Sequence, residues 1–329
     1  MPEQPVRLAS IGLGWWGSTL AAATTASADT VLEACFARSE DARNAFAEKH
    51  DCRAVGSIDE IWADPEIDGV LIATPHTTHA DLIEEAATAG KHIFVEKPMT
   101  LDVASAREAI EAASSAGVVL QVGHNKRRQT GNRFVHEKVT DGTLGEIQHI
   151  ETNISVPIAF KPDLPEWRQT RAELPAGGMT PLGVHMLDTI HYLGGDVKRV
   201  YAMSRRVSKR LEVDDVTTIL FELESGAGAY LATLIAVPNV TTVAAFGTEG
   251  AAWSEADGAH AFFQARGEPY RSEVPMTTID TIHDEIVEFA ACIRTGAEPE
   301  TGASEGLAVI EVFEAILRSI AEDGPIDVR

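Results

Sequence analysis

The chain has few cysteines, no long apolar run and no recognisable leader. Its three cysteines, Cys35, Cys52 and Cys292, are far apart and include no CxxC pair. This spacing excludes a disulfide framework and a cysteine-based zinc site, and it is typical of a reducing compartment. No apolar run approaches the roughly 18 residues that a membrane-spanning helix needs. The N-terminal residues lack the basic region and apolar stretch of a secretory signal. We therefore expect a cytoplasmic protein.

Basic residues are scarce relative to acidic ones. The chain has 27 Lys and Arg against 50 Asp and Glu, which gives a formal net charge of −23. Nucleic acids and anionic membrane surfaces both require a basic face, so neither is expected as a partner. The hydrophobic share of 44% is typical of a globular protein, and 329 residues suffice for about two domains.

The first part of the chain alternates short apolar runs with longer helical patterns. The runs are Val6–Ile11, Val31–Phe36, Gly69–Ala73, His92–Val95 and Val118–Val122. Because they lack a polar face, they are expected to be strands covered on both sides, as in a parallel sheet flanked by helices. The pattern predicts a doubly wound α/β domain over residues 1–122.

Beyond residue 122 strands follow one another with short turns between them. The expected strands are Ile147–Ile154, Val197–Ser204, Val216–Leu223, Ala229–Ala236 and Thr241–Gly247, and the expected helices are Asn132–Thr140, Ile279–Thr295 and Ser304–Ala321. Short connections favour antiparallel pairing. Residues 123–329 are therefore predicted to be an α+β domain with a large, mainly antiparallel sheet. Since the boundary is a strand end, the two domains are expected to abut and form a cleft.

A glycine fingerprint, Gly12-Leu13-Gly14-Trp15-Trp16-Gly17, directly follows the first expected strand and opens a helical segment. Gly12 permits a tight turn, Gly14 allows a pyrophosphate to approach the backbone, and Gly17 lets the helix pack closely on the strand. The helix N-terminus adds unpaired N–H groups and partial positive charge. We therefore predict a dinucleotide site here, with Trp15 and Trp16 beside the cofactor. Packing against the neighbouring strands is an equally ordinary role for both tryptophans.

The end of the second expected strand bears on which dinucleotide binds. NAD-specific sites place an acidic residue there to hold the ribose 2′-hydroxyl. This chain has Ala37 at that position, followed by Arg38 and Ser39. A guanidinium and a hydroxyl both suit a 2′-phosphate, so the sequence favours NADP(H). The alternative is that Arg38 stacks on adenine or faces solvent and NAD is accepted too.

Three motifs lie along the chain: GVLIATPHTTHADLIEEAATAGKHIFVEKP over residues 69–98, Gly177-Gly178 followed by Gly183-x-His185-x-x-Asp188, and the terminal GASEGLAVIEVFEAILRS. Together they resemble the Gfo/Idh/MocA family of nicotinamide-dependent oxidoreductases. The resemblance spans nearly the whole chain. It implies a cofactor-binding Rossmann domain and a second domain for substrate binding and oligomerisation. It also implies chemistry on sugars, polyols and related hydroxy compounds, and homodimers or homotetramers formed through the open sheet.

The resemblance implies that Lys97 and His185 are catalytic. Lys97 would polarise the substrate oxygen and help carry its proton while hydride passes between the nicotinamide and a secondary carbinol carbon. His185 would act as general base or acid, since the ordinary pKa of histidine lies near neutrality. Family members commonly carry Asp four residues before this histidine. Pro181 stands there instead and cannot share a proton.

Further site residues come from the motifs and their surroundings. Cofactor contacts are expected from Thr74, Pro75, His76, His79, Glu96 and Lys97, and substrate contacts from Asn125, Arg127, Trp167, Arg168 and Asp188. Several of these residues have an ordinary alternative role. His76 could be a helix-start residue whose hydrogen bonds are made within the protein, Arg127 could belong to a run of solvent-exposed charges, and Asp188 could be structural. His185, Asp188 and His191 lack the spacing of an HExxH motif, so no metal site is predicted.

The motifs thus predict an NADP(H)-dependent dehydrogenase or reductase acting on a sugar, polyol or related cyclic hydroxy compound. Two alternatives remain open at this point. Pro181 and the loop residue Trp167 slightly favour a dihydrodiol dehydrogenase of aromatic degradation. The loss of the family's Asp also fits a non-catalytic NADP-binding sensor, although the presence of both Lys97 and His185 argues against it.

Overall fold

The computed structural model describes residues 4–328, which form two compact units. The first unit combines the chain up to Gly123 with Asp280–Leu307, and the second combines His124–Ile279 with the chain from Ala308 onward. The change of unit after Gly123 lies beside the predicted boundary at residue 122. Residues 280–307 were predicted to lie in the second domain but pack in the first unit. Residues 1–3 and 329, which the predicted domains include, lie outside the described residues.

The first unit is built on a parallel sheet with the strand order β3-β2-β1-β4-β5-β6. The strands are β1 (Val6–Ile11), β2 (Thr30–Phe36), β3 (Arg53–Ala54), β4 (Gly69–Ile72), β5 (His92–Val95) and β6 (Leu120–Val122). The order reverses between β1 and β4. In doubly wound folds, ligands bind outside the carboxyl ends of the strands at this reversal.

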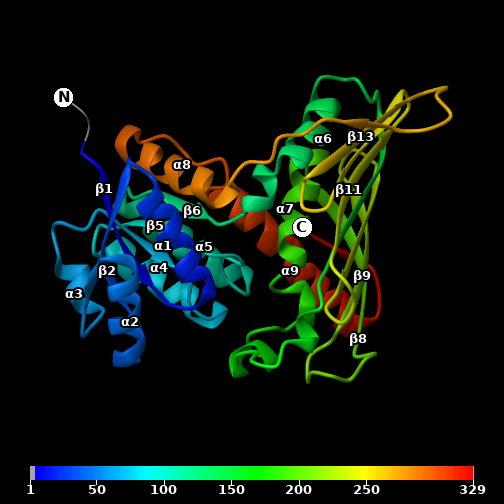
Figure 1. Cartoon of the computed structure of the whole chain (residues 1–329). Coiled ribbons are helices and arrows are strands. Elements are labelled where there is room, and N and C mark those ends of the chain that lie inside the picture. Colours follow the sequence, from blue (N-terminus) through cyan, green and yellow to red (C-terminus); the bar gives the residue numbers. More distant parts are fainter. Residues whose placement is uncertain (1–3, 329) are drawn as a thin grey trace. The chain divides into compact units, whose positions relative to one another are not determined.

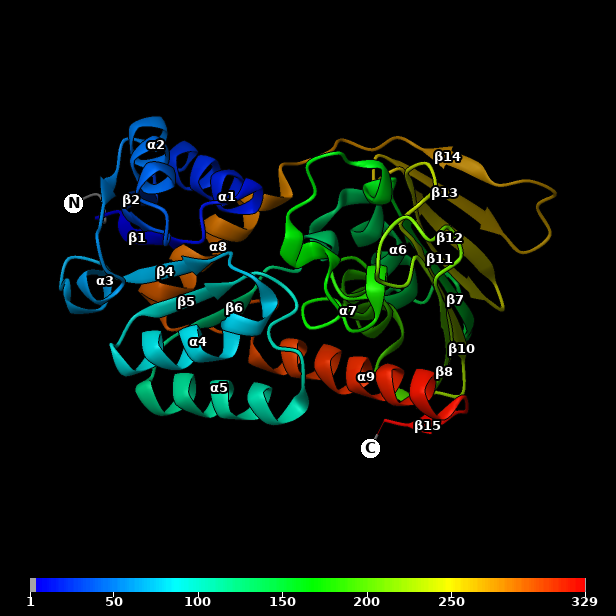
Figure 2. The same ribbon diagram turned by 90° about the horizontal axis from the view of Figure 1, so that it is seen from below.

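Helices cover both faces of this sheet. They are α1 (Trp15–Ala26), α2 (Glu40–His50), α3 (Asp59–Ala63), α4 (His79–Thr88), α5 (Val103–Ala116) and α8 (Thr281–Thr295). In Figure 2, α4 and α5 lie on one face, and α1 and α8 lie on the other. Local signals set the helix ends. The Asp102 side chain accepts a hydrogen bond from the backbone N–H of Ser105 at the start of α5, and Gly117 ends that helix in the left-handed conformation.

The second unit contains a nine-stranded sheet in the order β14-β13-β12-β11-β7-β10-β9-β8-β15. The strands are β7 (Ile147–Ser155), β8 (Val197–Arg205), β9 (Val216–Leu223), β10 (Gly228–Leu234), β11 (Val240–Gly247), β12 (Gly250–Glu255), β13 (His260–Ala265), β14 (Ser272–Val274) and β15 (Ile326–Asp327). All pairings are antiparallel except that of β7 with β10.

Helices cover one face of this second sheet and leave the other open. Figure 1 shows α6 (Thr130–Thr140), α7 (Gly183–Gly194) and the later part of α9 (Ala303–Glu322) on the covered face. In β9, Thr217, Ile219, Phe221 and Leu223 are buried and alternate with more exposed residues. This alternation is typical of a sheet with one packed and one open face.

The predicted fold class is confirmed: an α/β Rossmann unit and an α+β unit with a mainly antiparallel sheet. Strands β3, β12, β13, β14 and β15 were not predicted. The two-residue strands β3 and β15 are too short to show a period, and β15 is a strand only because Ile326 pairs with Val200 of β8. Among residues 4–328, no helix is both long and apolar enough to cross a membrane.

Helix α8 belongs to the core of the first unit. Its residue Phe289 is fully buried and meets Phe94 of β5 edge to face, with the ring centroids 5.9 Å apart. Leu8 and Leu71 lie in the same apolar cluster.

Phe289→Ala should therefore destabilise the first unit although residue 289 lies far along the chain. We expect the free energy of unfolding to fall by about 3–5 kcal/mol, the usual cost of removing a buried aromatic ring. Urea denaturation followed by circular dichroism measures this. Val207→Ala, at a position that is 66% exposed, is the control and should change stability little. Equal losses in the two variants would contradict the assignment of α8 to this core.

Candidate functional site

The loop between β1 and α1 requires glycine for steric reasons. Gly12 has a positive φ of 91°, and a Cβ there would lie 2.5 Å from the carbonyl oxygen of Ala73. A Cβ at Gly17 would collide with the carbonyl oxygen of Gly12. At Gly14, by contrast, a Cβ would meet no atom within 4 Å. Two glycines thus serve close packing of the backbone, and the third faces the open space into which a phosphate would fit.

Helix α1 begins with nothing negative at its N-terminus. Gly14 is its N-cap without a side-chain hydrogen bond, and the first turn contains no acidic residue. The helix dipole is therefore available to an anion. Trp15 is 73% exposed, and its ring meets that of Trp16 at a centroid distance of 4.7 Å. The loop, the open space at Gly14 and the uncapped helix fit a dinucleotide pyrophosphate.

The end of β2 presents basic groups and no carboxylate. Ala37 stands at the expected acidic position, and Arg38 and Ser39 are exposed. The Ser39 hydroxyl also accepts a hydrogen bond from the N–H of Ala42 and so caps α2. Arg43, which the sequence did not single out, donates from Nη1 to the carbonyl oxygens of Ala37, at 2.8 Å, and Arg38, at 3.3 Å. A second guanidinium therefore lies beside Arg38. The sequence could have indicated Arg43, because it lies one turn into α2, the helix that follows Arg38.

The turn after β4 holds four of the predicted cofactor residues. Thr74 and Pro75 form it, and the Thr78 hydroxyl bonds to the Thr74 hydroxyl at 2.7 Å. His76 is 5% exposed. His79 is fully buried and contacts backbone carbonyl oxygens through both ring nitrogens. Both ring nitrogens of His79 thus have partners inside the protein, and its contact with the cofactor stays a prediction.

Glu96 and Lys97 follow β5 at the carboxyl edge of the same sheet. Each is 6% exposed. The ammonium of Lys97 lies 5.5 Å from the centroid of the Trp16 ring, which comes from the glycine loop. A cation over an aromatic face is electrostatically attracted to it. The first unit thus brings the glycine fingerprint and Lys97 together, although Lys97 lies 80 positions after Gly17, the last residue of the fingerprint.

In the second unit, His185 lies in the first turn of α7 and is 3% exposed. The His124 ring faces it edge to face at a centroid distance of 6.0 Å, and His124 is 1% exposed. Sequence reasoning missed His124. The sequence could have indicated His124, because it lies two residues after β6 and next to Asn125. Side chains that follow parallel strands gather at the same edge of the sheet.

Arg127 and Asp188 form a buried, two-pronged ion pair. Arg127 Nε donates to Asp188 Oδ2 at 3.1 Å, and Nη2 donates to Oδ1 at 2.5 Å. The Arg127 guanidinium also lies 4.8 Å from the Tyr192 ring centroid, and that ring stacks on His136 at 3.7 Å. Each charge of the pair is matched by the other, so both residues are suited to hold α7 in place.

The other predicted substrate residues lie in two short helical turns of this unit. Asn125 is 8% exposed at the start of the 3₁₀ turn Asn125–Arg128. Trp167 and Arg168 lie in the turn Glu166–Gln169. The Arg168 guanidinium stacks over the Trp167 ring at 4.5 Å from the centroid.

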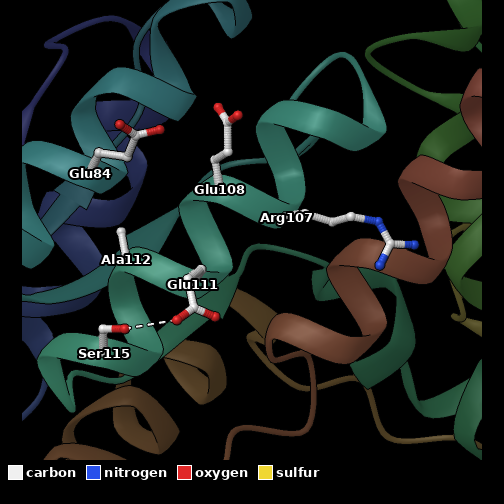
Figure 3. Close-up of a pocket in the computed structure, with 6 residues that line it drawn as sticks. All are labelled: Glu84, Arg107, Glu108, Glu111, Ala112 and Ser115. Carbon is white, nitrogen blue, oxygen red and sulfur yellow. Dashed lines mark hydrogen bonds between the residues drawn. The ribbon is translucent and has the colours of Figure 1, made fainter.

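A separate pocket on the first unit contains none of the predicted site residues. Figure 3 shows that it is lined by side chains of α4 and α5: Glu84, Arg107, Glu108, Glu111, Ala112 and Ser115. Three glutamates and an internal Ser115–Glu111 hydrogen bond of 2.9 Å make it a polar surface groove. Its chemistry does not fit a dinucleotide phosphate, because acidic groups repel anions.

Comparison with known proteins agrees with the geometry. Residues 6–124 match the model of the oxidoreductase family with an NAD-binding Rossmann fold, and residues 132–253 match the GFO/IDH/MocA C-terminal domain. The chain is 29% identical to inositol 2-dehydrogenase of Rhizobium meliloti, over 98% of this chain and 99% of that protein. It is 27% identical to D-xylose 1-dehydrogenase [NADP(+)] of Haloarcula marismortui, over 95% and 91% of the two chains.

Two further similarities bear on function. Trans-1,2-dihydrobenzene-1,2-diol dehydrogenase of Sus scrofa is 28% identical over 72% of each chain. The crystal structure of aldose-aldose oxidoreductase from Caulobacter crescentus, complexed with glycerol, superposes with a TM-score of 0.88 and 26% identity, covering 98% of this chain and 99% of that one.

The Rossmann unit, its glycine loop and these matches define an oxidoreductase that binds a nicotinamide dinucleotide. The chain belongs to the Gfo/Idh/MocA family. It is an enzyme of the NAD(P)-dependent dehydrogenase or reductase type.

His191 lies in α7, one turn after Asp188. Its Nδ1 lies 3.8 Å from Asp196 Oδ1. Burial lowers the pKa of His191, an effect that the nearby carboxylates of Asp188 and Asp196 only partly oppose. Among the described residues, no group of three or more His, Cys, Asp or Glu side chains is arranged to hold a metal ion.

His191 should make the protein less stable in mild acid. Its ring stays neutral in the folded state, whereas the unfolded chain takes up a proton below about pH 6.5. The free energy of unfolding should therefore fall as pH drops below that value, with at most about 1.4 kcal/mol per pH unit from this one proton. Urea unfolding between pH 5 and 7 measures the slope. His191→Gln should flatten it and exposed His260→Gln should not; an unchanged slope in His191→Gln would refute the assignment.

Proposed function

We propose that the protein transfers hydride between NADP(H) and a secondary alcohol or ketone of a sugar, polyol or related cyclic hydroxy compound. The observation that carries the proposal is the burial of Lys97 at the carboxyl edge of the parallel sheet, with its ammonium over the Trp16 ring of the glycine loop. The named activities of the inositol and xylose dehydrogenases support this substrate class.

The protein's own groups supply position and proton handling. When bound, the nicotinamide accepts or releases the hydride. Lys97 donates a hydrogen bond to the substrate oxygen and stabilises negative charge developing there. His185 takes up or returns the hydroxyl proton, with His124 beside it in the same buried setting. Asp188 pairs with Arg127 and so serves to orient the helix that carries His185.

The remaining cofactor and substrate contacts are part of the same proposal. Gly12, Gly14, Gly17, Trp15 and Trp16 hold the pyrophosphate side, and Thr74, Pro75, His76 and Glu96 border the nicotinamide side. Asn125, Trp167 and Arg168 contact substrate, and Arg127 acts mainly through its ion pair. The second unit is thus the substrate-binding domain and the first the cofactor-binding domain.

A dihydrodiol of aromatic degradation is a second candidate substrate. The similarity to the Sus scrofa dihydrodiol dehydrogenase favours it, and Trp167 offers an aromatic ring for stacking. Purified enzyme with NADP⁺ should be assayed against inositols, aldoses and trans-dihydrodiols. The substrate with the highest kcat/KM decides between the two classes. Absence of turnover with every compound would contradict the proposed substrate classes.

Lys97→Ala should abolish turnover while NADPH binding stays largely intact. The lysine is proposed to act on the substrate oxygen, so its loss removes transition-state stabilisation rather than the dinucleotide site. Steady-state assays measure kcat, and fluorescence titration measures the Kd for NADPH. Lys198→Ala, at an exposed lysine paired with Glu222, is the matched control and should behave like the native enzyme. Normal turnover in Lys97→Ala would remove this residue from the mechanism.

We propose NADP(H) as the preferred cofactor. Arg38 is exposed at the end of β2, Ala37 supplies no carboxylate, and the Arg43 guanidinium lies against the backbone of the same turn. Two cations, together with the lack of a carboxylate at position 37, favour a 2′-phosphate. That a family member is named as NADP(+)-dependent also supports this preference.

Ala37→Asp should reverse the preference towards NADH. A carboxylate at this position accepts hydrogen bonds from the ribose hydroxyls and repels a 2′-phosphate. Arg38→Ala should weaken NADPH binding by about 10- to 100-fold, as expected for one charge-assisted contact, and leave NADH binding nearly unchanged. Parallel titrations of native and variant proteins measure both effects. Tighter binding of NADH than of NADPH by the native protein would overturn the preference.

We also propose a cytoplasmic homodimer or homotetramer formed through the open face of the second sheet. The strand register aligns a row of side chains across that face: Tyr201, Leu220, Tyr230, Glu151, Ala244, Trp253 and Phe262. Leu220 is 54% exposed and lies between two tyrosines. Apart from the buried Ala244, the row is at least partly exposed, which is typical of a surface that a second copy covers.

A further inference from the structure

His79 joins two turns at the carboxyl edge of the first sheet. It is the first residue of α4 and its side chain is fully buried. Its Nδ1 lies 2.8 Å from the carbonyl oxygen of Pro98, and its Nε2 lies 3.1 Å from the carbonyl oxygen of Thr74. Both distances are those of hydrogen bonds.

The two carbonyl groups belong to the two turns that frame the proposed reaction site. Thr74 follows β4 and precedes Pro75, and Pro98 directly follows Lys97 after β5. Strands β4 and β5 are hydrogen-bonded neighbours, but the turns beyond their ends have no ladder to hold them. The imidazole therefore supplies a link between the two turns at the point where the ladder stops.

The carbonyl oxygens of Pro98 and Thr74 that contact the two ring nitrogens are both acceptors. A carbonyl oxygen cannot donate a hydrogen bond, and a neutral imidazole has a single N–H. Only the imidazolium, with a proton on each nitrogen, can bond to both oxygens. The His76 ring faces the His79 ring edge to face, at a centroid distance of 5.8 Å and an interplanar angle of 74°. Two charge-assisted hydrogen bonds are also stronger than neutral ones, which suits a fully buried cation.

We infer that His79 is a positioning residue for Lys97: as a doubly protonated ring, it fixes the Pro98 carbonyl beside Lys97 to the Thr74 turn. The inference rests on the proposed role of Lys97 and adds to it the group that holds the lysine in place. The effect of His79 reaches the reaction through the backbone at residue 98.

Three substitutions separate the two hydrogen bonds. His79→Asn places an amide N–H near the position of Nδ1 and keeps the bond to Pro98, whereas His79→Gln places one near Nε2 and keeps the bond to Thr74. His79→Leu keeps the approximate size of the side chain and removes both bonds. A matched control is His92→Leu, at the opposite end of β5, where the ring accepts a hydrogen bond from the Val119 N–H.

We expect kcat to fall by about 100-fold in His79→Leu, as for a small misplacement of a catalytic group. The Kd for NADPH should change less than threefold. His79→Asn should recover most of kcat, because the retained bond is the one next to Lys97, and His79→Gln should recover less. His92→Leu should lose stability without losing kcat. Thermal unfolding of each variant separates lost stability from lost turnover.

Nitrogen NMR of the native protein tests the protonation state without any substitution. Nearly equal ¹⁵N shifts for the two His79 ring nitrogens, both with attached protons, would support the imidazolium. One nitrogen without a proton would overturn it.

Lys97→Ala distinguishes failure of the inference from failure of the proposed function. Inactive Lys97→Ala together with full kcat in His79→Leu overturns only the positioning role. Full activity of Lys97→Ala overturns the proposed function itself.

Discussion

The parallel hydrogen bonding of β1 to β4 is the constraint on which the first unit depends. It places the glycine loop after β1 directly against the turn after β4, so that a Cβ at Gly12 would meet the carbonyl oxygen of Ala73. Helix α1 then starts so close to this loop that Gly17 has no room for a side chain. The same sheet edge receives Lys97 from β5. Sheet order therefore decides which residues meet, and glycine allows them to meet closely.

In the second unit, a buried ion pair plays the corresponding organising role. Arg127 comes from the short turn after the first unit, and Asp188 comes from α7, which also carries His185. Burying one of these charges alone would be costly, so each requires the other to be present. Tyr192 and His136 extend the arrangement to α6 by stacking. Helix α7 is thereby held in one orientation, which sets the direction of the His185 side chain.

Local patterns predicted those site residues whose roles depend on their immediate neighbours in the chain. The glycine fingerprint is such a case, because turn, helix start and close packing all occur within six residues. Lys97 is another, since an apolar strand ends just before it. Asp188 and His79 were harder to assign, because both pair with groups outside their own segments. Nothing near Asp188 indicates an arginine 61 residues earlier as its partner.

The fold class, the dinucleotide loop and the candidate lysine could be predicted from the sequence, because strand burial, glycine spacing and strand ends all depend on residues close together in the chain. That α8 packs in the first unit and that His124 faces His185 became known only from the three-dimensional structure. These relations arise when segments distant in the chain bury surface against one another. Hydrophobic burial is non-directional, so a local pattern shows that a face is buried but not what covers it.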